Sequence, residues 1–133
     1  MKKSLFLVAA MLVSSNALAA TDHYILRDGA HVQHLKISTV KGEVTVAEDV
    51  DFEPNASEAG REPCSADVSG EAKTVAPNEL VLKKHAAGQA AFCELKVHLS
   101  PTGAKVDQSE DCGNFAAGIC RFSTDGKELV KVQ

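Results

Sequence analysis

Aromatic side chains are scarce in this chain: its 133 residues include no Trp, one Tyr and five Phe. A paired-carboxylate glycosidase, whose cleft stacks sugars on aromatic rings, is therefore disfavoured. No Ser stands in a Gly-x-Ser-x-Gly sequence, and no context activates Ser65, Ser69, Ser109 or Ser123. The sequence contains no complete catalytic motif, so we expect no catalytic residues and no enzymatic activity.

The longest apolar run is short and lies near the start of the sequence. Lys2 and Lys3 precede an uninterrupted apolar segment from Leu5 to Val13, and Ala17-Leu18-Ala19 supplies the small residues that a signal peptidase reads. About nine apolar residues are too few to cross a hydrocarbon core as a helix. We therefore predict that residues 1–19 are a cleaved signal peptide, and we expect a periplasmic or secreted protein without stable membrane insertion.

Cleavage after Ala19 would leave residues 20–133 as a single β-rich domain of 114 residues. Loss of Lys2 and Lys3 lowers Lys plus Arg from 14 to 12 against 18 Asp plus Glu, a net charge of −6. An acidic surface repels phosphate backbones and attracts basic partners. We expect a protein partner and no nucleic acid, while the oligomeric state stays open.

All four cysteines lie in this domain: Cys64, Cys93, Cys112 and Cys120. In an exported chain such thiols oxidise in pairs, so two disulfides are predicted, with three possible pairings. The short Gly-containing segment between Cys112 and Cys120 favours joining these two, and Cys64 to Cys93. No Cys-x-x-Cys pair is present, which disfavours a zinc site, and we expect no cofactor.

Apolar and polar residues alternate between turn-forming residues, a pattern typical of strands. Lys41-Gly42 and Asp125-Gly126 predict hairpin turns. Residues 54–63 contain no apolar side chain larger than Ala and are predicted to be a flexible loop. The predicted strands are residues 31–40, 43–52, 66–75, 79–84, 92–99, 104–107, 118–123 and 128–132. We predict an all-β fold, a small antiparallel β-sandwich or partly open β-barrel with two disulfides.

Histidines and acids outside these patterns are candidate metal ligands. His31 and His34 are three residues apart with His23 nearby, but positions i and i+3 of a strand point to opposite faces, which favours surface histidines. The acidic run Glu48, Asp49, Asp51 and Glu53 aims its last three members to one side, yet it has no Gly for a calcium-binding loop. We interpret it as a solvated stripe or a docking surface for a basic protein, and we expect no metal site.

The segment from Asp111 to Phe122 places two half-cystines around a loop with two glycines. It is either a disulfide-braced connection or a rigid protrusion that enters a partner's cleft, its ordering entropy already reduced by the bridge. On the second interpretation the partner-binding residues are Asn114, Phe115 and Arg121.

The spacing of the cysteines and of the predicted strands gives the last half of the chain a family resemblance. The run from Gly70 to Val132, with Cys93-Glu94-Leu95-Lys96-Val97, Cys112 and Gly118-Ile119-Cys120-Arg121-Phe122, resembles small exported bacterial β-domains, among them periplasmic lysozyme inhibitors. The chain lacks the Ser-Gly-x-x-Tyr motif of the membrane-bound and periplasmic c-type lysozyme inhibitors, so their inhibitory residues have no counterpart here. The resemblance implies binding and not catalysis.

The leading hypothesis is a periplasmic protein-binding domain, an inhibitor or immunity protein against a basic cell-wall hydrolase such as a lysozyme. A cationic hydrolase would meet the acidic surface with a raised association rate. One alternative is a structural or accessory envelope protein that pairs through an exposed edge strand. The other is a small periplasmic hydrolase with no recognisable motif.

Overall fold

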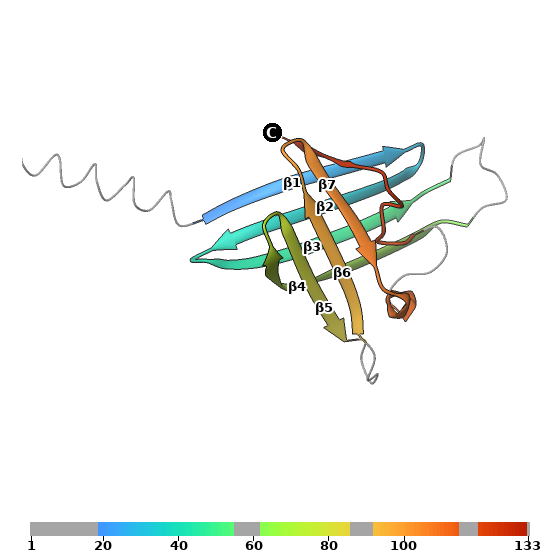
Figure 1. Ribbon diagram of the computed structural model, residues 1–133. Coiled ribbons are helices and arrows are strands. Elements are labelled where there is room, and N and C mark those ends of the chain that lie inside the picture. Colours follow the sequence, from blue (N-terminus) through green and yellow to red (C-terminus); the bar gives the residue numbers. More distant parts are fainter. Residues whose placement is uncertain (1–18, 55–61, 86–91, 115–119, 133) are drawn as a thin grey trace, which may run out of the picture.

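The computed structural model describes residues 19–54, 62–85, 92–114 and 120–132, which form eight antiparallel strands and one short 3-10 helix (Figure 1). These are β1 (Ala19–Asp28), β2 (His31–Val40), β3 (Glu43–Phe52), β4 (Cys64–Ala76), β5 (Glu79–His85), β6 (Phe92–Leu99), β7 (Gly103–Gln108), η2 (Glu110–Asn114) and β8 (Leu129–Val132). Each strand pairs with the next, and β8 pairs with β1. The predicted all-β fold is confirmed, and the barrel is closed.

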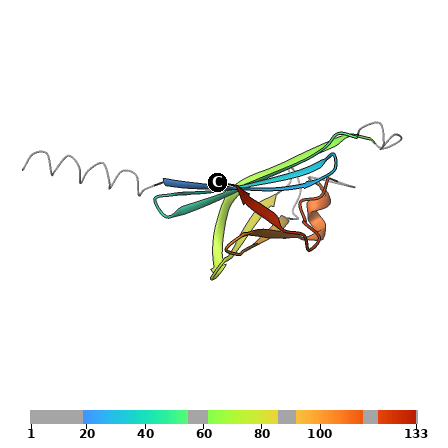
Figure 2. The same cartoon turned by 90° about the horizontal axis from the view of Figure 1, so that it is seen from above.

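The barrel is flattened into two layers that cross. Strands β1 to β4 run side by side in one layer, and β5 to β7 cross them in the other (Figures 1 and 2). β4 belongs to both layers, because Cys64 to Ala72 pair with β3 whereas Ala72 to Ala76 pair with β5. Because β5 to β7 cover one side of β1 to β4, the other side of these four strands is a long, open outer face (Figures 1 and 2).

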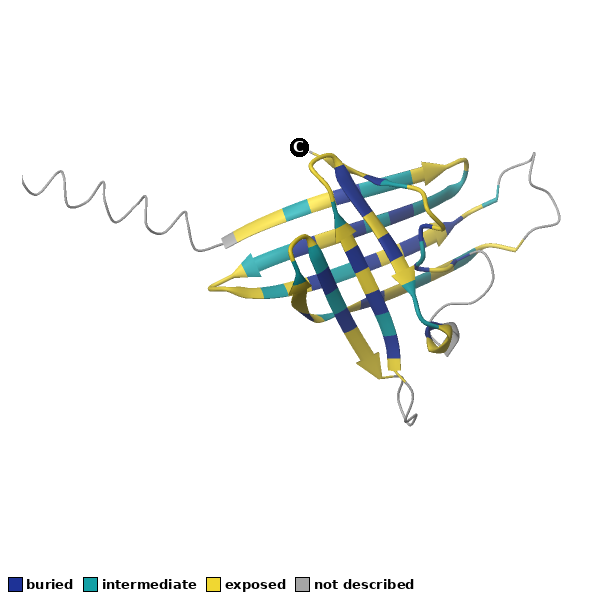
Figure 3. Cartoon of the chain, viewed as in Figure 1, coloured by how far each residue is buried: buried dark blue, intermediate teal, exposed yellow. Residues whose placement is uncertain are grey.

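Alternation along the strands separates the core from solvent (Figure 3). In β3, Val46, Val50 and Phe52 face the interior, whereas Asp49 and Asp51 are exposed. Every strand contributes at least one inward apolar side chain to a single cluster. Since that cluster fills the barrel, most polar side chains of β1 to β4 lie on the outer face; Gln33 and Glu48 are the buried exceptions among the described residues of these strands.

Local turn chemistry explains the best-predicted hairpin. Lys41 and Gly42 both have positive φ, 52° and 82°, the conformation of the two-residue turns that match strand twist. The predicted strands 31–40 and 43–52 are confirmed with these bounds, and residues 92–99 form a strand as predicted.

Two strand predictions need correction. β1 was not predicted, because Tyr24, Ile25 and Leu26 are three consecutive apolar residues and show no alternation with polar ones. In the structure Ile25 faces outward, opposite Val130 of β8, whereas Tyr24 and Leu26 face the other way. The predicted strand 118–123 is wrong for residues 120–123, which form no strand; residues 118 and 119 lie outside the described part of the chain. Asp125 and Gly126 do form the predicted turn, but no strand precedes it.

Side-chain amides replace a strand ladder at residues 121–123. Gln33 Nε2 lies 3.2, 3.3 and 3.2 Å from the carbonyl oxygens of Arg121, Phe122 and Ser123, which share its two N–H donors. Gln108 Oε1 accepts from the backbone N–H groups of Phe122 and Ser123 at 2.7 and 3.0 Å. These bonds satisfy a buried backbone that an adjacent strand would otherwise pair.

Both disulfides are present, but the favoured pairing is wrong: Cys64 is bonded to Cys120 and Cys93 to Cys112. The β6–β7 ladder pairs Leu95 with Gln108, so the chain that leaves β7 passes the start of β6. η2 then turns Cys112 onto Cys93. Two disulfides are typical of an oxidising compartment outside the cytosol. Within the described ranges, none of the helices has the length and apolarity of a membrane span.

Candidate functional site: an acidic outer face

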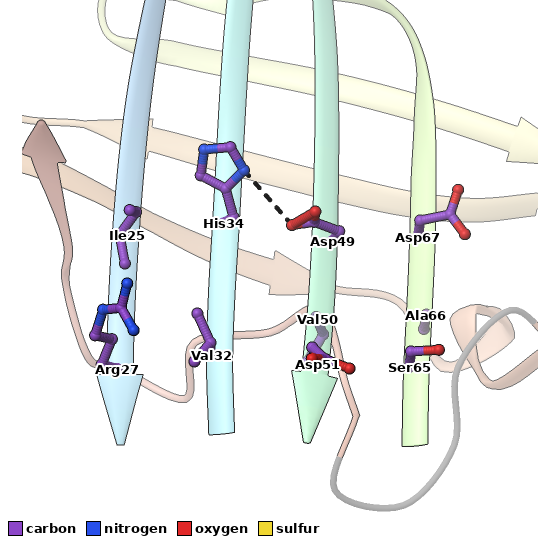
Figure 4. A pocket seen from close by; sticks show the side chains of 10 residues that line it. All are labelled: Ile25, Arg27, Val32, His34, Asp49, Val50, Asp51, Ser65, Ala66 and Asp67. Atoms are coloured by element: carbon purple, nitrogen blue, oxygen red, sulfur yellow. Dashed lines mark ion pairs between the residues drawn. The ribbon is translucent and has the colours of Figure 1, made fainter. Parts of the chain in front are cut away.

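Strands β1 to β4 align five polar residues across their outer surface. His34 of β2 lies opposite Asp49 of β3, which lies opposite Asp67 of β4. His23 of β1 lies diagonally beside His34, and Asp51 follows Asp49 on the same face. We call His23, His34, Asp49, Asp51 and Asp67 the acidic face; Figure 4 shows four of them projecting from neighbouring strands.

The acidic face is hollowed. One depression of about 590 Å³ extends from His34, Asp49 and Asp67 over Arg27, Asp51 and Ser65. A second, of about 370 Å³, shares His34, Asp49 and Asp67 and extends over His23, Lys36 and Ser69. The two depressions meet along the row of His34, Asp49 and Asp67, where polar side chains from three strands line the same open surface.

A chain of polar contacts crosses β1, β2 and β3. His34 Nδ1 lies 3.6 Å from Asp49 Oδ1, and His34 Nε2 lies 3.2 Å from His23 Nδ1. When the proton of neutral His34 is on Nδ1, toward the carboxylate, Nε2 is the acceptor and the Nδ1–H of His23 is the donor. The two ring planes differ by 8°. The ring centroids are 5.3 Å apart, which exceeds the 3.2 Å between the facing nitrogens by nearly one ring width, so the rings meet edge to edge.

Negative charge on the face is only partly compensated. Asp49 contacts His34, whereas Asp51 and Asp67 make no ion pair with any residue in the described ranges. Asp49 and Asp67 are direct cross-strand neighbours, an arrangement in which like charges destabilise a sheet. A cationic ligand over this point would relieve that repulsion.

Glu48 is the one member of the predicted acidic run that faces inward. It is 1% exposed, and neither carboxyl oxygen has a hydrogen-bond partner among the described residues. Desolvation, with a smaller contribution from the charge of Asp49, raises the pKa of Glu48 well above 4.5. Burial therefore disfavours a negative charge on Glu48 behind the acidic face.

The partner-binding residues predicted from the sequence lie elsewhere. Arg121 is half exposed, contacts Asp125 at 3.5 Å and lines neither depression. Asn114 ends η2, and Phe115 lies outside the described residues. The predicted protrusion stays a prediction.

The remaining histidines are dispersed, and the opposite-face argument for His31 and His34 is confirmed. His31 is directed to the Phe52 ring, at a centroid distance of 6.5 Å, whereas His34 faces outward. His98 lies 3.3 Å from Asp107 on the other layer. The sequence interpretation missed the His23–His34 pair. The two-residue turn Gly29-Ala30, with Gly at its first position, joins β1 to β2 and brings the two histidines onto neighbouring strands.

The acidic face combines two kinds of polar group, carboxylates and imidazoles. Carboxylates recognise ammonium and guanidinium groups, and facing imidazole nitrogens share a proton or bind a cation. Within the described ranges, no group of three or more His, Cys, Asp or Glu side chains is placed to hold a metal ion. No protein-family model, curated protein or solved structure matches this chain.

Proposed function

We propose that this chain is an exported protein-binding domain that holds a basic protein partner on its acidic face. The observation that carries the proposal is the juxtaposition of Asp49 and Asp67, with Asp51 beside them, on a hollowed and solvent-exposed surface. Among the residues that the structure describes, no cationic side chain forms an ion pair with Asp51 or Asp67 to offset this repulsion. A lysine or arginine side chain of a partner supplies the missing charge.

A basic cell-wall hydrolase of the lysozyme type is the partner we propose, with the chain acting as a periplasmic inhibitor or immunity protein. Two disulfides suit an oxidising envelope compartment. The excess of acids over bases raises the encounter rate with a cationic enzyme. The open shape of the face suits a protein surface better than a small substrate, which prefers an enclosed pocket.

The test is the affinity of the mature protein for a panel of muramidases and amidases at low ionic strength. Asp51→Asn with Asp67→Asn removes two uncompensated charges, and we expect about tenfold weaker binding, since each exposed pair contributes up to about 1 kcal/mol. The matched control, Asp107→Asn with Glu110→Gln, removes the same charge from β7 and η2 and should retain most of the affinity.

Two results would overturn the proposal. Wild-type protein that neither binds nor slows any enzyme of the panel removes the hydrolase as partner. Equal losses in the two charge variants would mean that net charge alone, and not the acidic face, governs binding. Phe115→Ala and Arg121→Ala test the predicted protrusion in the same assay.

A further inference from the structure

His23 and His34 face each other through nitrogen atoms that need something between them. With Nδ1 of His23 and Nε2 of His34 at 3.2 Å, two lone pairs would repel, so the pair shares either a proton or a metal ion. A proton fills this role in the metal-free protein. The same position is open to a divalent transition metal, for which imidazole is a preferred ligand.

Asp49 lies where a carboxylate can orient the His34 ring as a metal ligand. A metal-binding histidine commonly directs its second ring nitrogen to a carboxylate, which fixes the tautomer and ring orientation and raises the basicity of the ligating nitrogen. Here Nδ1 of His34 lies 3.6 Å from Asp49 Oδ1, while Nε2 faces His23. His98 and Asp107 form a similar contact at 3.3 Å, but the described residues place no second histidine ring beside His98.

The distances agree with the size of a zinc site. A tetrahedral zinc ion with Zn–N bonds of about 2.0–2.1 Å holds two ligating nitrogens about 3.3 Å apart. The observed separation is 3.2 Å, and the two rings are within 8° of parallel, with their nitrogen-bearing edges together. A metal ion beside the two nitrogens therefore needs little change in their separation, and rotation of the exposed side chains turns both lone pairs toward it.

The surroundings leave room and favour positive charge. The depression of about 370 Å³ around the pair also contains Asp49, Asp67 and Lys36. Two carboxylates outweigh the single ammonium group, and the long, exposed Lys36 side chain can turn toward solvent. Since the described residues place no third His, Cys, Asp or Glu side chain within ligating reach of the pair, water molecules would complete the coordination.

We propose that His23 and His34 form a two-histidine site for a divalent transition metal, with Asp49 as the positioning residue for His34. The site needs no partner protein and does not depend on the proposed function. A metal ion at this position takes Nδ1 of His23, so the single proton of that neutral ring moves to its Nε2, and the metal enters the neutral pair without net proton release.

The test is a calorimetric titration of the full mature protein with Zn²⁺ in two buffers of different ionisation enthalpy, with Mg²⁺ as the hard-cation control. We expect one zinc ion per chain, the same heat in both buffers when both imidazoles start neutral, since no net proton is then released, and no Mg²⁺ binding. His23→Ala and His34→Ala should each weaken binding more than tenfold. Asp49→Asn should weaken it by about tenfold, the lower end for loss of such a carboxylate.

His98→Ala is the matched control and should bind zinc as the wild type does. Because His23 and His34 lie at the surface, their variants should keep the wild-type melting temperature without metal, which separates a lost ligand from a lost fold. The site is refuted if wild-type protein binds no zinc, or if binding survives both single histidine substitutions. Wild-type affinity in Asp49→Asn would refute the positioning role of Asp49.

Discussion

Glu48 should limit the stability of the barrel, and replacing it with Leu should stabilise the protein. The side chain is 1% exposed, Leu35 and Val68 flank it on the adjacent strands, and its oxygens have no partner in the described ranges. A buried polar group without a hydrogen bond costs about 1–3 kcal/mol. Glu48→Leu removes this cost with little change in volume, so we expect the free energy of unfolding at pH 7 to rise by about that amount or more.

The pH dependence identifies the cause. The folded-state pKa of Glu48 is raised, so the unfolded chain loses its proton first as pH rises. Wild-type stability should therefore be highest below about pH 4.5 with respect to this group. It should fall by up to about 1.4 kcal/mol per pH unit until the folded-state pKa is passed, and then level off. Glu48→Leu lacks this slope, so its advantage over wild type should be smallest in acid and grow toward neutral pH.

The assay is urea unfolding followed by circular dichroism from pH 4 to pH 8, with both disulfides intact. Glu48→Gln keeps an unpaired buried amide but cannot ionise, so it should lose the slope while retaining part of the constant cost. Glu71→Leu, on the exposed side of β4, is the control and should change stability by no more than about 0.5 kcal/mol. A Glu48→Leu variant that is no more stable than wild type at pH 7, with the same slope, would refute this reasoning.

Three further substitutions test how the barrel closes. A Cβ on Gly103 would overlap the carbonyl oxygen of Leu129, so Gly103→Ala should lower the free energy of unfolding in urea by at least about 2 kcal/mol. Gln33→Leu leaves the carbonyl groups of residues 121–123 without their side-chain donor; it should cost about 1–3 kcal/mol and increase amide exchange in the segment after Phe122. Loss of the Cys64–Cys120 bridge, which spans 56 residues, should cost about 1 kcal/mol more than loss of Cys93–Cys112, which spans 19, in paired Cys→Ser variants; equal costs would contradict the loop-entropy argument.

The hairpins were predictable because their information is local. Lys41-Gly42 favours a two-residue turn, and Val44 and Val46 begin an alternation that the whole of β3 continues. The same locality bears on the disulfides. Once the β6–β7 hairpin is aligned, Gln108 lies opposite Leu95 and the chain toward Cys112 returns to Cys93. The proximity of Cys112 and Cys120 in sequence was a poorer guide than that alignment.

The C-terminal closure could not be predicted, because its partners are distant in sequence. The strand-like pattern of residues 120–123 is real, since Phe122 is fully buried. Its backbone, however, is satisfied by Gln33, which is 88 to 90 residues away. Amide side chains can take the place of a neighbouring strand only where the folded barrel brings them next to the segment, and no local sequence pattern indicates such a contact.

The candidate site was harder to predict than the core for a related reason. Hydrophobic alternation fixes which residues point inward, but it leaves the identity of the outward residues free, so their chemistry emerges only when four strands are aligned. Asp49 illustrates this. Across β2 it meets His34, and across β4 it opposes Asp67. One carboxylate thus contributes both to the proposed histidine site and to the cross-strand repulsion with Asp67 on which the proposed partner binding rests, while its sequence neighbour Glu48 is buried in the core.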